Sequence, residues 1–362
     1  RREGSGPKRR IVGASPILLD GARGLQGPSP PRRAGAMGGV RGAVGNRPMR
    51  LTLPWTSRIG LEQAQQFVAQ PGDVFIVSYP KTGTTMAQQL CHQLRTGGHV
   101  DFEEVSDEVP WLEVAPSLGQ PIDASQRALP RCFKTHQSFS TLSHLEGARF
   151  LCLVRDPEKT LVSEFKQKLA KGSPAAAARD VNAFARQRIF LGDDREAEGE
   201  VPLQFAGTIW EYYVEMWKCK DMPEVRVFVY ERLAAEMEEQ VDSLAEFMGL
   251  PRPAEEVRRR ALEFTSLGWM SSNSHKFDDN HIGRWWSRSH PGEECKFTHS
   301  SKVGLQMEGC NACVTSETRA LLSRKWTEVV TPATGHTCYA DFAAALRRDG
   351  DVARGADDVA KR

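Results

Sequence analysis

The sequence lacks any hydrophobic run that could cross a membrane as a helix. Such a helix needs about 20 consecutive apolar residues, whereas the longest apolar run near the middle of the chain is Phe-Leu-Cys-Leu-Val at residues 150–154. No internal repeat is visible either. We therefore expect no transmembrane segment. The chain has 362 residues, 40% of them hydrophobic and 26% charged, which is ordinary for a globular enzyme.

An excess of basic residues is also missing once the first 50 residues are set aside. Those 50 residues hold 11 of the 48 Lys and Arg but only two of the 46 Asp and Glu, so the rest of the chain has a net charge of −7. A nucleic-acid-binding protein needs a dominant basic face, and we expect no nucleic-acid partner. Residues 1–50 are rich in Gly, Pro and Arg without periodicity, which predicts a disordered basic leader or, because acidic residues are scarce, an organelle targeting segment.

The eight cysteines lack the second pair that a zinc site at familiar spacing requires. Cys310 and Cys313 form a single CxxC, so we predict no metal, with a structural metal or a disulfide at this CxxC as the alternative. Cys91, Cys132 and Cys152 lie in apolar contexts and are expected to be buried free thiols. This suits a reducing compartment and predicts a cytoplasmic protein, or an organellar one if residues 1–50 are a transit peptide.

Apolar runs and helical periodicity alternate along the body of the chain. The strand-like runs are Val74–Tyr79, Cys132–Lys134, Arg149–Val154 and Val225–Tyr230. Helical patterns follow or separate them at residues 85–96, 158–170, 207–219, 234–248 and 255–264. This alternation predicts an α/β fold, with a single domain at residues 51–340 built on a central, mostly parallel sheet flanked by helices, and a polar tail at 341–362.

The most informative segment is the strand, loop and helix start at residues 73–85. An apolar run is followed by a loop with one lysine, Lys81, one glycine, Gly83, and three threonines, before a helical pattern that stops at Gly97. Free N–H groups at a helix start, together with a lysine, predict a site for a phosphate-like anion. The loop departs from GxxxxGK[ST] because its lysine precedes its only glycine. The ligand is therefore expected to be a phosphorylated nucleotide, and not obviously ATP.

Two further strand ends carry polar residues that belong on the same rim of a parallel sheet. Lys134 and His136 close the second strand, where an imidazole can take a proton from a hydroxyl while an ammonium steadies developing negative charge. Arg155 closes the third strand, and Asp156 can cap the following helix, which carries Ser163 about two turns later. Arg155 and that hydroxyl can clamp a second phosphate group.

These three segments resemble the cytosolic-type sulfotransferases, which use 3′-phosphoadenosine 5′-phosphosulfate (PAPS). The family's Tyr-Pro-Lys-[Ser/Thr]-Gly-Thr-Thr loop is matched by residues 79–85, its Lys-Thr-His by residues 134–136, and its Arg-[Asn/Asp]-Pro segment with a later serine by residues 155–163. Looser matches extend the similarity over residues 70–305. The resemblance implies a P-loop nucleotide-kinase-like fold and the activity of a PAPS-dependent sulfotransferase.

The resemblance also implies a role for each matched residue. His136 is the implied general base, and Lys81 and Lys134 are the implied catalytic cations. Arg155 and Ser163 are expected to hold the 3′-phosphate. The full set of implied contacts to PAPS is Lys81, Thr82, Gly83, Thr84, Thr85, Met86, Arg155, Ser163, Tyr230, Thr265, His299, Ser300, Lys302 and Gly304.

Some positions depart from the family pattern. Met86 stands where the family usually has a tryptophan that stacks on adenine, and Leu267 where an aromatic residue often follows Thr-Ser. His299 and Ser300 stand where an arginine and a lysine grip the 3′-phosphate, although Lys302 can partly compensate. A charge-assisted hydrogen bond is worth roughly 1.5–3 kcal/mol, so these changes predict weaker nucleotide binding.

The favoured function is transfer of the sulfuryl group from PAPS to a hydroxyl or amine of a small-molecule acceptor. A non-catalytic protein of the same fold that binds the nucleotide is the alternative, and a nucleotide or small-molecule kinase is a third reading. The acceptor pocket is expected around Val109–Glu113, residues 166–206 and residues 269–295. The sequence leaves the acceptor and the oligomeric state open.

Overall fold

The computed structural model describes residues 58–173, 176–186, 208–295, 303–305 and 307–346. All of them belong to one compact unit, residues 47–362. The predicted leader at residues 1–50 lies outside the described residues, and the predicted tail is described only as far as residue 346.

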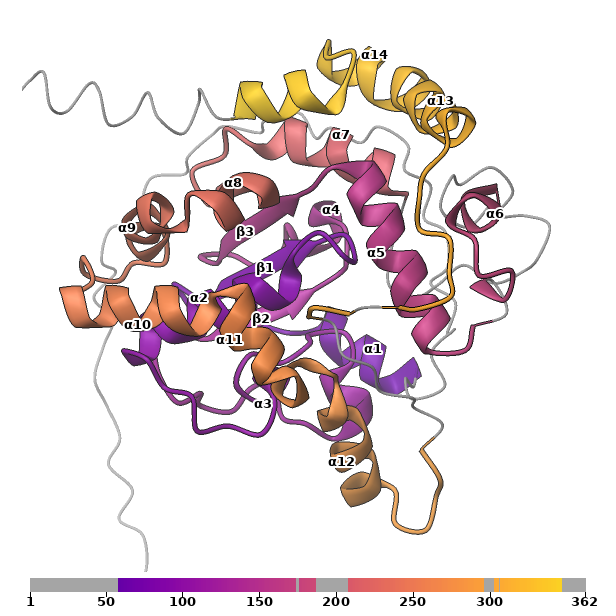
Figure 1. Cartoon of the computed structure of the whole chain (residues 1–362). Helices are drawn as coiled ribbons and strands as arrows, with labels where there is room; N and C mark the ends of the chain where they lie inside the picture. The colour runs from indigo at the N-terminus through magenta and orange to yellow at the C-terminus, as the bar shows by residue number, and fades with distance from the viewer. Residues whose placement is uncertain (1–57, 174–175, 187–207, 296–302, 306, 347–362) are drawn as a thin grey trace, which may run out of the picture. The chain divides into compact units, whose positions relative to one another are not determined.

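A parallel four-stranded sheet forms the centre of this unit (Figure 1). Its strands are β1 (Val74–Ser78), β2 (Cys132–Thr135), β3 (Arg149–Val154) and β4 (Val225–Val229), in the order β2-β1-β3-β4. Every residue of β1 is buried, as expected for a parallel strand covered on both faces. The predicted α/β fold and its strands are thus confirmed. The first and fourth strands are each one residue shorter than expected, the fourth because Tyr230 opens a helix, and the second is one residue longer.

Helices cover both faces of the sheet (Figure 1). Apolar side chains of one face pack with α2 (Thr84–Thr96), α8 (Tyr230–Ala235), α9 (Met237–Phe247) and α10 (Glu255–Thr265). Those of the other face pack with α1 (Arg58–Gln65), α4 (Phe139–Leu142), α5 (Pro157–Ala170) and α7 (Ile209–Cys219). The carboxyl ends of the strands and the polar residues that follow them therefore share one rim between two helical layers.

The helix predicted over residues 234–248 is wrong in detail. It is broken at Glu236, whose φ of −120° separates α8 from α9. Leu233 and Val241 still pack in the same apolar cluster. The apolar residues therefore keep their helical spacing across the break, and no Gly or Pro in the sequence marks its position. The patterns predicted at 85–96, 158–170, 207–219 and 255–264 are confirmed as α2, α5, α7 and α10.

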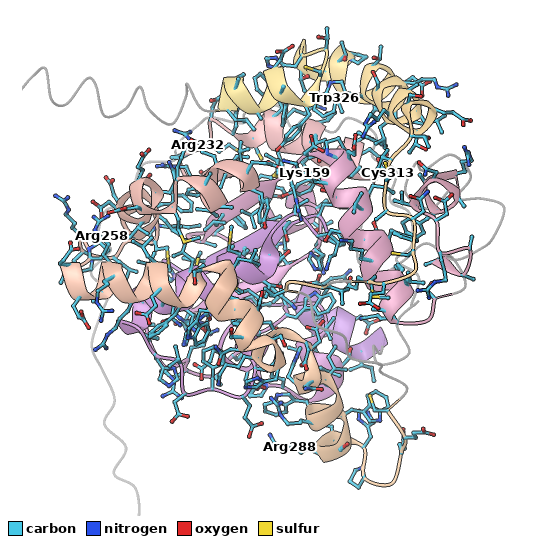
Figure 2. The ribbon with its side chains drawn as sticks, in the orientation of Figure 1. Lys159, Arg232, Arg258, Arg288, Cys313 and Trp326 are labelled. Carbon is cyan, nitrogen blue, oxygen red and sulfur yellow. The ribbon has the colours of Figure 1, made fainter. Side chains whose placement is uncertain are left out.

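Shorter elements lie beside the sheet and at the end of the chain. They are α3 (Val105–Glu108), η1 (Ala115–Leu118), α6 (Val181–Arg186), α11 (Leu267–Ser272), η3 (Ser274–Phe277), α12 (Asn280–Ser289), α13 (Ser316–Lys325), η4 (Trp326–Val330), α14 (Thr331–Thr334) and a helical segment at 339–346. Trp326, labelled in Figure 2, joins the C-terminal helices to α7, because its ring packs against Trp210 and Tyr213.

All eight cysteines are free, and Cys91, Cys132 and Cys152 are buried as predicted. Within the described part of the chain, no helix has the length and apolar character that a membrane span needs.

Candidate active site

The loop between β1 and α2 contains two positive backbone φ angles. Lys81 has a φ of 67° and Gly83 a φ of 110°, and Gly83 directly precedes the first turn of α2. A Cβ atom on Gly83 would lie 2.3 Å from Cδ2 of Tyr230, so only glycine lets the loop pass this close to the ring. The loop therefore leads tightly into a helix N-terminus, where backbone N–H groups and the helix dipole favour an anion.

The hydroxyl groups of this loop bond within the loop. Thr82 Oγ1 donates to the Tyr79 carbonyl oxygen at 2.6 Å, and Thr84 Oγ1 lies 2.6 Å from Ser78 Oγ. Thr82 is completely buried, whereas Thr85 is half-buried in the first turn of α2. The Thr82 side chain thus stabilises the loop through a hydrogen bond within it. Its hydroxyl therefore has a structural role, although the family resemblance assigns this residue to the nucleotide.

His136 lies against the base of the same loop. Its Nδ1 is 2.7 Å from the Ser78 carbonyl oxygen, and its backbone N–H donates to Glu113 Oε1 at 2.7 Å. A carbonyl oxygen can only accept, so Nδ1 carries the proton in the neutral imidazole and Nε2 is the nitrogen with the lone pair. Burial raises the pKa of the Glu113 carboxyl, while the hydrogen bond it accepts from the His136 backbone opposes this increase.

Lys134 shares a neighbour with His136. The Lys134 ammonium lies 4.3 Å from the centroid of the Trp111 ring, and the same indole meets the His136 ring edge-on at 5.3 Å between centroids. Lys134 is 2% exposed, and its Nζ is 3.4 Å from Asp279 Oδ1. A fully buried ammonium requires such a partner, because burying an isolated charge is costly.

Arg155 connects the third strand to the loop. Its Nη1 donates to the Lys81 carbonyl oxygen at 2.7 Å, and its guanidinium lies 4.3 Å from the centroid of the Tyr230 ring. Tyr213 donates its hydroxyl to the Arg155 carbonyl oxygen. Within the described residues, the buried Nε of Arg155 has no acceptor. Arg155, Lys81 and Tyr230 therefore form one contiguous group around Gly83.

The other expected contacts lie at varied positions. Thr265, 2% exposed, is the last residue of α10, whose end is held against α2 by a 3.1 Å bond from Gln89 Nε2 to the Phe264 carbonyl. Met86 and Ser163 are half-buried in α2 and α5, and Gly304 packs on Ser271 of α11. The remaining three, His299, Ser300 and Lys302, lie outside the described residues.

Three carboxylates in this region received no role from the sequence. Glu113 holds the His136 backbone, Asp279 faces Lys134, and Glu231 accepts the Asp156 N–H at 3.0 Å. Glu113 and Glu231 had a signal, since each ends a segment that loosely matches the resembled family. Asp279 had none, because it lies 145 residues from Lys134 and no local pattern joins the two.

Comparison with known proteins gives a consistent family. The sulfotransferase domain model matches residues 71–295. Sulfotransferase 4A1 from Homo sapiens is 26% identical over 206 residues, which cover 55% of this chain and 67% of that protein. Amine sulfotransferase from Oryctolagus cuniculus is 25% identical over 237 residues, covering 62% and 72%.

Among solved structures, mouse sulfotransferase SULT7A1 complexed with PAP superposes with a TM-score of 0.57 at 19% identity, covering 81% of this chain and 95% of that one. This likeness shows the shared fold, while the domain match spans more than half of the chain. The chain therefore belongs to the sulfotransferase family, the PAPS-dependent enzymes that its three motifs resemble.

Proposed function

We propose that the chain moves the sulfuryl group of PAPS to a hydroxyl or amine of a small-molecule acceptor, with His136 as general base. One observation carries this proposal: Nδ1 of His136 is engaged by the Ser78 carbonyl oxygen at 2.7 Å, at the base of the anion-binding loop. The proton on Nδ1 fixes the tautomer, and Nε2 is the atom that accepts a proton. Glu113 holds the same residue from its backbone side.

The residues around the loop fit a nucleotide with two anionic ends. Gly83 lets the loop lie against the Tyr230 ring, where a Cβ atom would overlap the ring, and the start of α2 favours a phosphate oxygen. On the other side, the buried Nε of Arg155 is a donor without an acceptor among the described residues. We assign the 5′-phosphosulfate to Lys81, Gly83, Thr84 and Thr85, the 3′-phosphate to Arg155 and Ser163, and the adenosine to Tyr230 and Thr265.

The reaction requires one proton transfer and one displacement. PAPS supplies the sulfuryl group. His136 Nε2 takes the proton of the acceptor hydroxyl while the acceptor oxygen bonds to sulfur. The bond from sulfur to the bridging oxygen breaks, and its electron pair stays on the 5′-phosphate of the departing 3′,5′-bisphosphoadenosine (PAP). Lys81 and Lys134 stabilise the negative charge that develops on the transferred group and on the leaving phosphate.

The test is a panel of phenols, alcohols, amines and sugars incubated with radiolabelled PAPS. Label is expected in at least one acceptor. His136→Ala should lower the rate by roughly 10²–10⁴-fold, the usual contribution of a general base. Lys81→Ala should lower it by roughly 10²–10³-fold, as when one group that stabilises transition-state charge is removed.

His144→Ala is the matched control. His144 is an exposed histidine that, like His136, follows β2 in the sequence. Its turnover should equal that of the wild type. Calorimetry with PAP should show that His136→Ala still binds the nucleotide, so that lost turnover reflects lost chemistry. Full activity in both His136→Ala and Lys81→Ala would refute the mechanism, and a wild-type protein that neither labels an acceptor nor binds PAP would refute the function.

A further inference from the structure

Lys134 has a buried counterion from a distant part of the chain. Lys134 Nζ lies 3.4 Å from Asp279 Oδ1, and the two side chains are 2% and 7% exposed. The partners are 145 residues apart in sequence. In such a buried place an ammonium is stable only with a close negative charge, because water cannot screen or solvate it.

The backbone at Asp279 explains which residue types can stand there. Asp279 has a φ of 65° and is one of three non-glycine residues with positive φ in the described chain, together with Lys81 and Arg179. It directly precedes α12, as the residue before the first helical position. Gly, Asn and Asp accept this left-handed conformation readily. Of these three, only Asp also brings the negative charge that Lys134 requires.

A second buried pair lies behind Asp279. Glu104 and His281 are both 0% exposed, and His281 Nδ1 and Glu104 Oε2 are in ion-pairing contact. One ligand atom from each of Glu104, Asp279 and His281 falls within 4.8 Å of the others. Such a trio can hold a metal ion, but the Lys134 ammonium already stands at Asp279 Oδ1. A divalent ion next to that ammonium would add positive charge to a dry site.

We propose that Asp279 is the positioning residue that holds the Lys134 ammonium at the reaction centre. The inference rests on the proposed function, in which Lys134 stabilises the transferred group. The Trp111 ring contacts both the Lys134 ammonium and the His136 ring, and Asp279 binds the same ammonium. In this assignment Asp279 acts through Lys134.

The test compares two neighbouring aspartates. Asp279→Asn keeps the size of the side chain and suits the positive φ, so it removes only the charge. It should lower kcat by about 10- to 100-fold with little change in the KM for the acceptor, because a displaced catalytic group costs rate more than binding. Asp278→Asn is the matched control. The Asp278 carboxylate bonds to the backbone N–H and the side chain of Asn280, and its loss should leave kcat unchanged.

A double variant asks whether Asp279 acts through Lys134. Lys134→Ala alone should be nearly inactive, and adding Asp279→Asn to it should have no further effect on the residual rate. An equal further loss would show an independent role and overturn the inference. A normal kcat in Asp279→Asn would also overturn the inference. In that case an inactive Lys134→Ala would still support the proposed function. One equivalent of zinc in the purified protein, lost in Asp279→Asn, would also overturn the inference.

If Asp279→Asn does not fold, a second double variant tests the pairing of Lys134 with Asp279. Lys134→Met with Asp279→Asn removes both charges together and should then recover a folded protein, because neither partner is left uncompensated. A double variant that is as unfolded as the single one would contradict the pairing. Wild-type protein without turnover on any acceptor would refute the proposed function first, and the inference with it.

Discussion

Gly83 faces the Tyr230 ring at the point where the nucleotide loop turns into α2. Its φ is 110°, and a Cβ atom here would lie 2.3 Å and 2.9 Å from two ring carbons of Tyr230. Gly83→Ala must therefore move either the ring or the loop. The Arg155 guanidinium lies over the Tyr230 ring, so a displaced ring would also displace Arg155. We therefore expect at least a tenfold weaker affinity for PAP by calorimetry. The variant should also lose about 1–2 kcal/mol of stability from the left-handed backbone.

Gly172→Ala separates the backbone strain from the clash. Gly172 has a φ of 66°, and nothing lies within 4 Å of its added Cβ. This variant should lose about 1 kcal/mol in urea unfolding and keep its affinity for PAP. If Gly83→Ala binds PAP as tightly as Gly172→Ala does, the close approach of the loop to Tyr230 has no role in nucleotide binding.

The elements that the sequence predicts well are those with a clear apolar pattern. β1 to β3 are short and almost fully buried apolar runs, β4 places apolar residues on both faces, and α2, α5, α7 and α10 carry their apolar residues at helical spacing. The cap of α5 was also predictable, since Asp156 Oδ1 accepts the Lys159 N–H at 3.0 Å. The site residues on the first three strand ends could be predicted for the same reason: the carboxyl ends of parallel strands share one rim.

The rest depends on contacts that no local pattern records. The break at Glu236 has no Gly or Pro to mark it, and α12 follows an aspartate with positive φ instead of a glycine. Asp279 meets Lys134 across 145 residues. The use of the Thr82 hydroxyl inside its own loop also follows from packing, since a threonine in such a loop looks the same whether it faces a ligand or the core.

Helix α2 contains a buried histidine that links the fold to pH. His92 is 0% exposed, its Nε2 lies 3.1 Å from His99 Nδ1, and Arg95 Nη2 lies 3.4 Å from its Nδ1. Burial, with the Arg95 charge adding to it, lowers the pKa of His92 from 6.5 to about 2. Between these values the unfolded chain binds a proton that the folded chain does not, so stability is complete above pH 6.5 and falls as the pH decreases.

From this we predict the acid sensitivity of the fold. Between pH 7.5 and pH 5.5, His92 should cost about 1.4 kcal/mol of unfolding free energy in urea titrations, since each pH unit is worth about 1.36 kcal/mol per group. His92→Gln should reduce the difference between the two pH values by that amount. The same measurement on His144→Gln, at an exposed position, controls for replacing a histidine as such. A His92→Gln variant with the pH dependence of the wild type would contradict the assignment.

The C-terminal helices pack on α7 and on the residues next to the nucleotide loop. Phe342, in the helical segment at 339–346, is 0% exposed, and its ring lies 5.6 Å from that of Trp326 and 5.8 Å from that of Tyr213. Next to it, Tyr339 donates to Glu231 Oε2 at 2.8 Å, while Glu231 Oε1 accepts from the Asp156 backbone. Phe342, beyond the predicted boundary at residue 340, thus packs on Tyr213, and Tyr339, just inside that boundary, bonds to the carboxylate that holds the Asp156 backbone.

Phe342→Ala should therefore destabilise the whole described unit. Truncating a buried phenylalanine leaves a cavity and costs roughly 3–5 kcal/mol, and Phe342→Leu should cost less because it keeps most of the apolar volume. Calorimetric and fluorescence unfolding should show one transition at a lower midpoint, since the ring joins the C-terminal helices to α7 and the α7 tyrosine Tyr213 bonds to Arg155. An early loss of the C-terminal helices, with the sheet unfolding at the wild-type midpoint, would show that they form an independent layer and do not support the nucleotide site.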